Sequence, residues 1–244
     1  MACSIIMITQ ILLTPAAGSD VANIKTTAVR DGDYYIVNGS KKWITNGIWA
    51  DYVTAAVRTG GTGAGGISIL IIPLAAPGVT RRQMFNSGVG ASGSTFITFD
   101  EVRVPCENLV HKEGRGFEVI MANFNPERKN IATLSIRLSR VCVEDAWNHA
   151  CTRETFGRKL IENAIIRDKF VKMGRMIEPA QAFLEQLTWL IELSRTSGKQ
   201  DAVRIGGMTA MLKVVGTRCL EKCVREAQQI MGGLGYAKGG KGGR

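Results

Sequence analysis

The hydrophobic pattern of the chain changes its period once. Up to residue 105, short strand-like runs are separated by glycine-containing turn dipeptides. After residue 117, apolar residues recur at helical spacing over three long stretches, at about 117–151, 163–193 and 200–231. No single type of secondary structure accommodates both periods, so the sequence predicts an α+β chain with two domains.

The first domain, residues 1–110, is predicted to be an antiparallel β-barrel or sandwich. Asp31-Gly32 and Asn38-Gly39 separate strand-like runs, and such dipeptides favour tight hairpins because they tolerate positive φ. The second domain, residues 111–244, is predicted to be an antiparallel helical bundle, because short links join its long helices.

The composition is ordinary for a soluble globular protein, since 45% of the 244 residues are hydrophobic and 21% are charged. No apolar run is long enough to span a bilayer, and the apolar first residues lack a basic leader. We therefore expect neither a membrane span nor a signal peptide. The six cysteines are scattered without a C-x-x-C pair. This favours a reduced, intracellular protein and leaves mitochondrial, peroxisomal and cytoplasmic locations open.

The net charge of +10 favours anionic partners, such as nucleic acid, an acidic membrane surface, or a phosphorylated cofactor or substrate. The basic residues are spread along the chain and are not interleaved with aromatic residues, which disfavours nucleic acid. His111 and His149 are the only histidines, and neither has a cysteine or histidine at motif distance. We therefore expect no metal site and no Ser-His-Asp hydrolase.

Glu127 is the one polar residue in an otherwise apolar helical stripe. The stripe comprises positions 117, 120, 124, 127, 131, 134, 138 and 141. A carboxylate held on an apolar face takes up a proton more readily, which is how a general acid or base is tuned. The alternative is that Pro126 bends the helix and exposes Glu127, which then pairs with Arg128, Lys129 or another base.

Trp43 and Thr45 lie two residues apart in a predicted strand and therefore share one face. An aromatic wall beside a hydroxyl group could hold a planar heterocycle, whereas the alternative is a core tryptophan before a turn. Ser19 lies in the small-residue loop PAAGSD. Backbone amides in such a loop could approach a ligand, or the loop could simply turn the chain.

Arg153, Thr155 and Phe156 belong to RETFGRKL, a segment between two predicted helices. Arginine with a hydroxyl group at a helix junction suits a phosphate, although a solvated loop has the same composition. The segment QIMGGLGY ends a predicted helix and contains Gln229, Gly232 and Gly233. Because no strand precedes it, it is not a dinucleotide-binding G-x-G-x-x-G motif, and a simple helix stop is the alternative.

Six motifs occur in the order found in the acyl-CoA dehydrogenase family: PAAGSD, VNGSKKWITNG, ITFDEVRVP, GRGFEVI, RETFGRKL and QIMGGLGY. From Pro15 to Tyr236, the chain resembles the middle β domain and most of the C-terminal helical bundle of that family. The resemblance implies that FAD lies between the two domains. The family's N-terminal helical domain and last bundle helix have no counterpart here, so we expect a chain that is truncated at both ends.

The resemblance assigns several residues to FAD. Trp43 and Thr45 match the W-I-T that packs beside the flavin and hydrogen-bonds its reactive edge. Arg153, Thr155 and Phe156 match the R-x-T-F-G that reaches FAD in a neighbouring subunit.

Further residues are assigned to the ADP part of FAD and to the substrate. Gln229, Gly232 and Gly233 match the glycine-rich segment that meets the ADP part across the dimer. Ser19 matches the serine of G-S-D near the thioester and the flavin, and Arg128 matches an arginine close to the substrate.

The resemblance implies an oxidoreductase in which a carboxylate removes the α-proton of an acyl-CoA and the β-hydride passes to flavin N5. Glu127-Arg128 resembles the E-R pair by which isovaleryl-type and long-chain-type members place that carboxylate on the first bundle helix. The resemblance also implies fatty acid β-oxidation and a homodimer or homotetramer. A dehydrogenase would pass its electrons to an electron-transferring flavoprotein.

Two alternatives stay open on the sequence. One is an acyl-CoA oxidase, whose reduced flavin reacts with oxygen. The other is a non-catalytic fragment, or a DNA-binding or partner-binding relative of the same fold, which the truncation and the charge permit. The sequence departs from the family at Leu13 and Thr14, where the family has T-E before a proline, and at Ala164, where it commonly has a glutamine.

Overall fold

The computed structural model describes residues 8–11, 18–197, 202–237 and 239. The chain forms two compact units, Met1–Ala122 and Asn123–Arg244. Helix α1, Gly116–Thr152, begins in the first unit and continues into the second.

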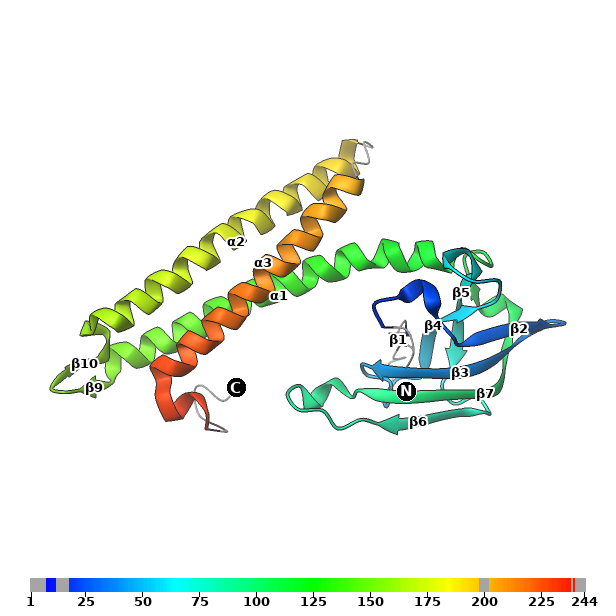
Figure 1. Ribbon diagram of the computed structural model, residues 1–244, viewed down its shortest axis with the longest axis horizontal. Coiled ribbons are helices and arrows are strands. Elements are labelled where there is room, and N and C mark those ends of the chain that lie inside the picture. The colour runs from blue at the N-terminus through cyan, green and yellow to red at the C-terminus, as the bar shows by residue number, and fades with distance from the viewer. Residues whose placement is uncertain (1–7, 12–17, 198–201, 238, 240–244) are drawn as a thin grey trace, which may run out of the picture. The chain divides into compact units, whose positions relative to one another are not determined.

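Eight strands of the first unit form one sheet, which Figure 1 draws in blue to green. The strands are β1 (Ile8–Ile11), β2 (Thr27–Asp31), β3 (Tyr34–Ile44), β4 (Tyr52–Arg58), β5 (Ile67–Pro73), β6 (Val79–Gln83), β7 (Thr95–Pro105) and β8 (Leu109–Val110). The order along the sheet is β6-β7-β3-β2-β4-β5-β8, and β1 pairs with β4 outside this path.

The sheet is mixed, which corrects the prediction of an antiparallel barrel or sandwich. β1 and β2 both pair with β4 in parallel, while the remaining pairs are antiparallel. Among the described strands, β6 and β8 at the two ends each pair with one neighbour only, so the sheet does not close into a barrel. Turn dipeptides reveal hairpins but not strands that pair across longer connections, and the parallel pairs were therefore missed.

One hydrophobic core lies against the sheet. Inward-facing residues alternate along β3 and β7, as in Tyr35 and Val37 or Val102 and Val104. β4 and β5 are buried over longer runs because they lie in the interior of the sheet. Removal of these apolar surfaces from water supplies the main stabilising term for the unit.

The predicted turn at Asn38-Gly39 is wrong, whereas the one at Asp31-Gly32 is confirmed. Gly32, with φ of 57°, lies between the paired strands β2 and β3. β3 runs through Gly39, which has φ of 133° and follows a register shift against β7. A Cβ at Gly39 would lie 2.8 Å from Cα of Thr26. The glycine therefore serves a bulge and a close approach of two backbones, not a hairpin.

Lys41 on β3 is completely buried, and its Nζ donates to the carbonyl oxygen of Ala56 on β4 at 2.5 Å. The pairing of β1 with β4 ends at Ala55, and that of β2 with β4 is at Arg58. Lys41 thus donates a hydrogen bond to the backbone of β4 at a residue, Ala56, that lies between its pairing with β1 and its pairing with β2. Loss of hydration lowers the pKa of Lys41 to about 7, because burial disfavours the charged amine.

The second unit consists mainly of long helices, and this prediction is confirmed. After α1 come the short strands β9 (Glu154–Thr155) and β10 (Arg158–Lys159), the 3-10 turn η5 (Leu160–Glu162), α2 (Ala164–Ser197), α3 (Ala202–Met231) and η6 (Gly232–Gly235). In Figure 1, α2 (yellow) and α3 (orange) run side by side in opposite directions. Within the part of the chain that the structure describes, no helix combines the length and the apolarity that crossing a membrane requires.

Two hydrophobic clusters hold the helices together. One lies near the end of α1 and contains Ala146, Ala150, Met173, Cys219 and Cys223 with their neighbours. The other lies nearer the middle of α1, around Ala132 and Leu187. Cys219 and Cys223 lie one turn apart on α3 and are both buried in the first of these clusters.

The burial of Lys41 predicts a pH dependence of stability. The amine titrates at about 7 in the folded chain against an ordinary 10.5, so over this interval the unfolded chain holds a proton that the folded chain has released. The free energy of unfolding therefore rises with pH, by on the order of 2 kcal/mol between about pH 7 and about pH 9. Lys41→Met should abolish this rise in urea denaturation. The exposed Lys25→Met is the control and should retain it; an unchanged rise in Lys41→Met would contradict the assignment.

Candidate functional site

Trp43 lies at the end of β3 in an unusual backbone conformation. Its φ is 63°, a left-handed value that is strained for a bulky residue and that recurs at functional sites. A register shift between Lys41 and Ile44 accompanies it. The side chain is 53% exposed, which excludes the core tryptophan that the sequence left open.

Thr45, two residues after Trp43, is also exposed. β3 ends at Ile44, so Thr45 lies in a turn and not in the strand that the sequence predicted. Nevertheless, the bulge leaves Trp43 and Thr45 exposed on either side of a buried Ile44. Nζ of Lys42 lies 4.9 Å from the ring centroid of Trp43. The end of β3 therefore presents an aromatic ring, a hydroxyl group and a cation to solvent.

Ser19 is exposed in a bend that precedes the short 3-10 turn η1, Val21–Asn23. Its position in a small-residue loop agrees with the sequence. Leu13 and Thr14, where the sequence departs from the family pattern, lie outside the described residues.

The helical unit contains a pocket of about 650 Å³. Arg153 and Thr155 come from the end of α1 and from β9, and Gly232 and Gly233 come from the end of α3. The full lining is His149, Arg153, Thr155, Leu160, Ile230, Met231, Gly232, Gly233 and Leu234. Four residues that the sequence singled out in two distant segments thus meet in one place.

The glycines at the end of α3 keep this pocket open. Gly232 has φ of 58°, which ends the helix in the manner of a glycine C-cap. A Cβ at Gly232 or Gly233 would meet no other atom within 4 Å, so a side chain there would occupy free space beside the pocket. The carbonyl oxygen of Gly233 accepts from the backbone N–H groups of Tyr236 and Ala237. The segment is therefore ordered by its own backbone.

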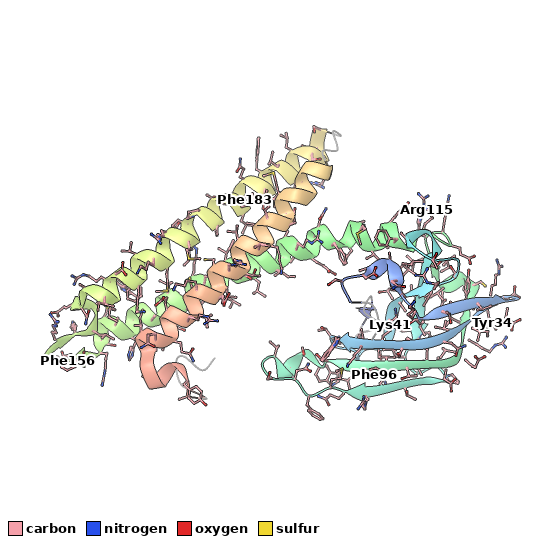
Figure 2. All side chains as sticks on the ribbon, in the orientation of Figure 1. Tyr34, Lys41, Phe96, Arg115, Phe156 and Phe183 are labelled. Atoms are coloured by element: carbon pink, nitrogen blue, oxygen red, sulfur yellow. The ribbon has the colours of Figure 1, made fainter. Side chains whose placement is uncertain are left out.

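Phe156 and Gln229 do not line the pocket. Phe156 and Gly157 both have positive φ and form the two-residue turn between β9 and β10. The phenyl ring is fully exposed at the tip of this hairpin, as Figure 2 shows. Gln229 is exposed on α3. A fully exposed phenylalanine at a hairpin tip is available to another chain or to a ligand bound there.

Glu127 is exposed on α1, and Pro126 lies within the helix without ending it. Nδ2 of Asn123, one turn earlier, donates to Oε1 of Glu127. No ion pair joins Glu127 to Arg128, Lys129 or any other residue that the structure describes. The alternative interpretation of the sequence therefore predicted the exposure of Glu127 correctly and its ion pair with a base wrongly.

Arg128 turns away from its acidic neighbour, and its guanidinium lies 5.3 Å from the ring centroid of Phe124. Beyond Glu127, three apolar members of the predicted stripe are exposed: Ile131, Leu134 and Leu138. The carboxylate thus lies at one end of an exposed apolar face.

Sequence reasoning missed part of the pocket. His149 was considered only as a metal ligand or a hydrolase residue, yet it lines the pocket one helical turn before Arg153. The spacing of one helical turn between His149 and Arg153 was the sequence signal that could have identified His149. Leu160, Ile230, Met231 and Leu234 are apolar residues without a pattern to distinguish them from core. Among the described side chains, no group of three or more potential ligands could hold a metal ion.

The chemical character of the two places differs. The end of β3 offers a flat ring beside a hydroxyl group, which suits a planar heterocycle. The pocket in the helical unit offers an arginine, a hydroxyl group and open backbone at two glycines, which suits a phosphate-bearing group. Both sets of residues therefore fit parts of a flavin dinucleotide.

Comparison with known proteins gives the same picture for both units. The family described as "Acyl-CoA dehydrogenase, middle domain" matches residues 11–102, and "Acyl-CoA dehydrogenase, C-terminal domain" matches residues 114–244. The chain is 48% identical to "Acyl-CoA dehydrogenase apdG" of Emericella nidulans, over 93% of this chain and 52% of that protein. It is 47% identical to "Acyl-CoA dehydrogenase AFT10-1" of Alternaria alternata, over 93% of this chain and 53% of that protein.

Among solved structures, a probable acyl-CoA dehydrogenase from Mycobacterium abscessus superimposes with a TM-score of 0.90 at 38% identity. The match covers 97% of this chain and 61% of that one. The chain thus spans about half the length of the curated relatives that it matches.

From the lining of the pocket, we predict that FAD binding depends on Arg153 and not on the neighbouring Arg158. Arg153→Ala removes the one arginine among the described residues that line the pocket. It should weaken binding about tenfold, because a charge-assisted hydrogen bond to phosphate contributes on this scale. The neighbouring Arg158→Ala, outside the lining, is the matched control and should bind FAD as the unaltered protein does. Quenching of flavin fluorescence measures both affinities. Equal losses in the two variants would indicate a general effect of charge and would contradict the assignment.

Proposed function

Because the chain belongs to the acyl-CoA dehydrogenase family, we propose that the protein oxidises the α,β carbon–carbon bond of an acyl-CoA thioester and uses FAD. One observation carries the proposal beyond family membership. The fold joins Arg153 and Thr155 to Gly232 and Gly233 in one pocket. Resemblance assigned these four residues to FAD before their positions were known.

Two sets of residues would hold the cofactor. Trp43 and Thr45 would contact the flavin ring, because the bulge at the end of β3 leaves both side chains exposed. In FAD held by a second copy of the chain, Arg153 would bind the diphosphate, and the backbone at Gly232 and Gly233 would admit the ADP part. When bound, FAD supplies the acceptor for a hydride.

Glu127 would remove the α-proton of the substrate. Asn123 donates to Oε1, while Oε2 accepts no hydrogen bond from any described residue, so Oε2 is the oxygen that would take the proton. The exposed Ile131 one turn further on would lie beside an acyl chain. A carboxylate among apolar groups is a stronger base than one in water, once a substrate covers it.

Ser19 and Arg128 would contact the substrate side of the site. Ser19 is exposed and offers a hydroxyl group. The guanidinium of Arg128 lies over the ring of Phe124, and none of the ion pairs among the described residues joins it to Glu127.

The proposal includes partners. Phe156 is fully exposed and would contact FAD in a second copy of the chain, so we propose a homodimer or homotetramer. A dehydrogenase would pass electrons to an electron-transferring flavoprotein, whereas an oxidase would pass them to oxygen. Fatty acid β-oxidation is the metabolic role that the resemblance favours.

A second candidate is a non-catalytic relative that binds nucleic acid, which the net charge of +10 permits. Retention on DNA that falls steeply with salt, in a protein whose flavin no acyl-CoA reduces, would support this candidate instead.

Substitution of the base tests the proposed function. Glu127→Gln preserves the size and the hydrogen bond from Asn123 but cannot accept a proton. We expect FAD binding to be unchanged and anaerobic flavin reduction by an acyl-CoA to slow by roughly 10²–10⁴-fold.

Glu144→Gln on the same helix is the control, because Glu144 is also exposed. Its reduction rate should equal that of the unaltered protein. Stopped-flow absorbance measures the rates, and a Glu127→Gln protein that is reduced at the normal rate would place the base elsewhere.

A further inference from the structure

The turn that follows β3, residues 45–50, carries a set of carbonyl groups that need donors. Asn46 has φ of 64°, and its N–H donates to the carbonyl of Ser92 at 2.7 Å. The N–H groups of Trp49 and Ala50 both donate back to the carbonyl of Asn46, at 3.2 and 3.0 Å. The segment is thus one helical turn. Its last carbonyl groups accept no hydrogen bond within the turn and carry a partial negative charge.

Arg81 on β6 supplies these donors. Its Nη1 lies 2.9 Å from the carbonyl oxygen of Ala50, 3.2 Å from that of Ile48 and 3.4 Å from that of Gly47. Two N–H groups on one nitrogen are therefore shared among three acceptors. A guanidinium at this position caps the turn and adds the attraction of a full charge.

The sheet register explains why Arg81 reaches the turn and its neighbour does not. Arg81 pairs with Ile97 on β7, and Ile97 pairs with Lys41 on β3. Residues that are directly opposite share a face, so Arg81, Ile97 and Lys41 lie on one face of the sheet. Ile97 and Lys41 are buried there, whereas Arg81 on the end strand β6 is exposed. Arg82 points to the other face, where its guanidinium lies 5.6 Å from the ring of Phe96, a residue labelled in Figure 2.

The same turn is packed closely from a second direction. A Cβ at Gly93 would lie 2.3 Å from the indole of Trp49, so the loop between β6 and β7 touches this ring directly. Thr95 at the start of β7 pairs with Ile44, and a Cβ at Gly47 would lie 3.0 Å from Cβ of Thr95. Movement of the turn would therefore carry Thr45, and the strained Trp43 before it, away from their present places.

We propose that Arg81 is a positioning residue for the flavin-facing end of β3: its guanidinium holds the carbonyls of Gly47, Ile48 and Ala50 and thereby fixes the conformation of Trp43 and Thr45. This inference rests on the proposed function, which assigns those two residues to the flavin. Arg81 itself touches neither cofactor nor substrate in this account. Its effect on FAD passes entirely through the turn.

The test compares Arg81→Ala with Arg82→Ala by two measurements on the purified protein. The first is amide hydrogen exchange at Asn46, Trp49 and Ala50 without FAD, which should be about tenfold faster in Arg81→Ala because the cap is lost. The second is FAD affinity, which should fall about tenfold in the same variant. Millimolar guanidinium ion should restore both in Arg81→Ala, which a merely destabilised protein would not show.

The control Arg82→Ala removes the same charge from the other face and should change neither measurement. A second control is Ile97→Val, which removes one buried methyl group from the same row and lowers stability without removing a donor. FAD affinity in Ile97→Val should equal that of the unaltered protein.

Several results would overturn the inference: unchanged exchange in Arg81→Ala, faster exchange with unchanged FAD affinity, or equal losses in Arg82→Ala. These outcomes differ from failure of the proposed function. If the unaltered protein does not bind FAD, the proposed function fails and this inference fails with it. If the unaltered protein binds FAD and Arg81→Ala binds it equally well, only the role of Arg81 is wrong.

Discussion

The left-handed backbone at Trp43 is the constraint on which the β unit's site depends. A bulky residue in this conformation costs on the order of 1–3 kcal/mol and persists only where the surroundings hold it. The surroundings here are a register shift against β7, the buried bridge from Lys41 to Ala56, and the carbonyl contacts of Arg81. Relaxation of the bulge would restore strand alternation and change which side chains face solvent. The ring of Trp43 is therefore exposed because these contacts of the sheet prevent the backbone from relaxing to a regular strand.

The helical unit reaches its site by a different route. Its pocket is formed by the ends of elements, namely the end of α1, the hairpin β9–β10 and the end of α3. Near these ends, Ala146 and Ala150 of α1 belong to the same buried hydrophobic cluster as Ala227, Ile230 and Met231 of α3. Close packing of the helices fixes where α3 stops, and Gly232 then turns the chain. The packing of the helical core thus also determines the geometry of the pocket.

The sequence predicted the long helices well, because periodic apolar residues over thirty or so positions leave few alternatives. It failed where the deciding partner is remote. Asn38-Gly39 reads as a hairpin unless the approach of Thr26 is known, and Lys41 reads as a surface lysine unless the carbonyl of Ala56 is known. The pocket residues Arg153 and Gly232 were found through motifs in fixed order, not through local pattern. The exposure of Glu127 was an open alternative, and among the described residues Glu127 has a hydrogen bond from Asn123 in place of the expected ion pair.

We propose that Glu127 takes a proton and bound FAD takes a hydride from adjacent carbons of an acyl-CoA. The most direct measurement is the mass of the acyl-CoA recovered after anaerobic incubation with the FAD-saturated protein, across a series of acyl chains. For at least one acyl chain, we expect an acyl-CoA product that has lost two hydrogen atoms, in an amount equal to the flavin reduced. Recovery of every acyl-CoA unchanged from a protein that holds FAD would contradict it.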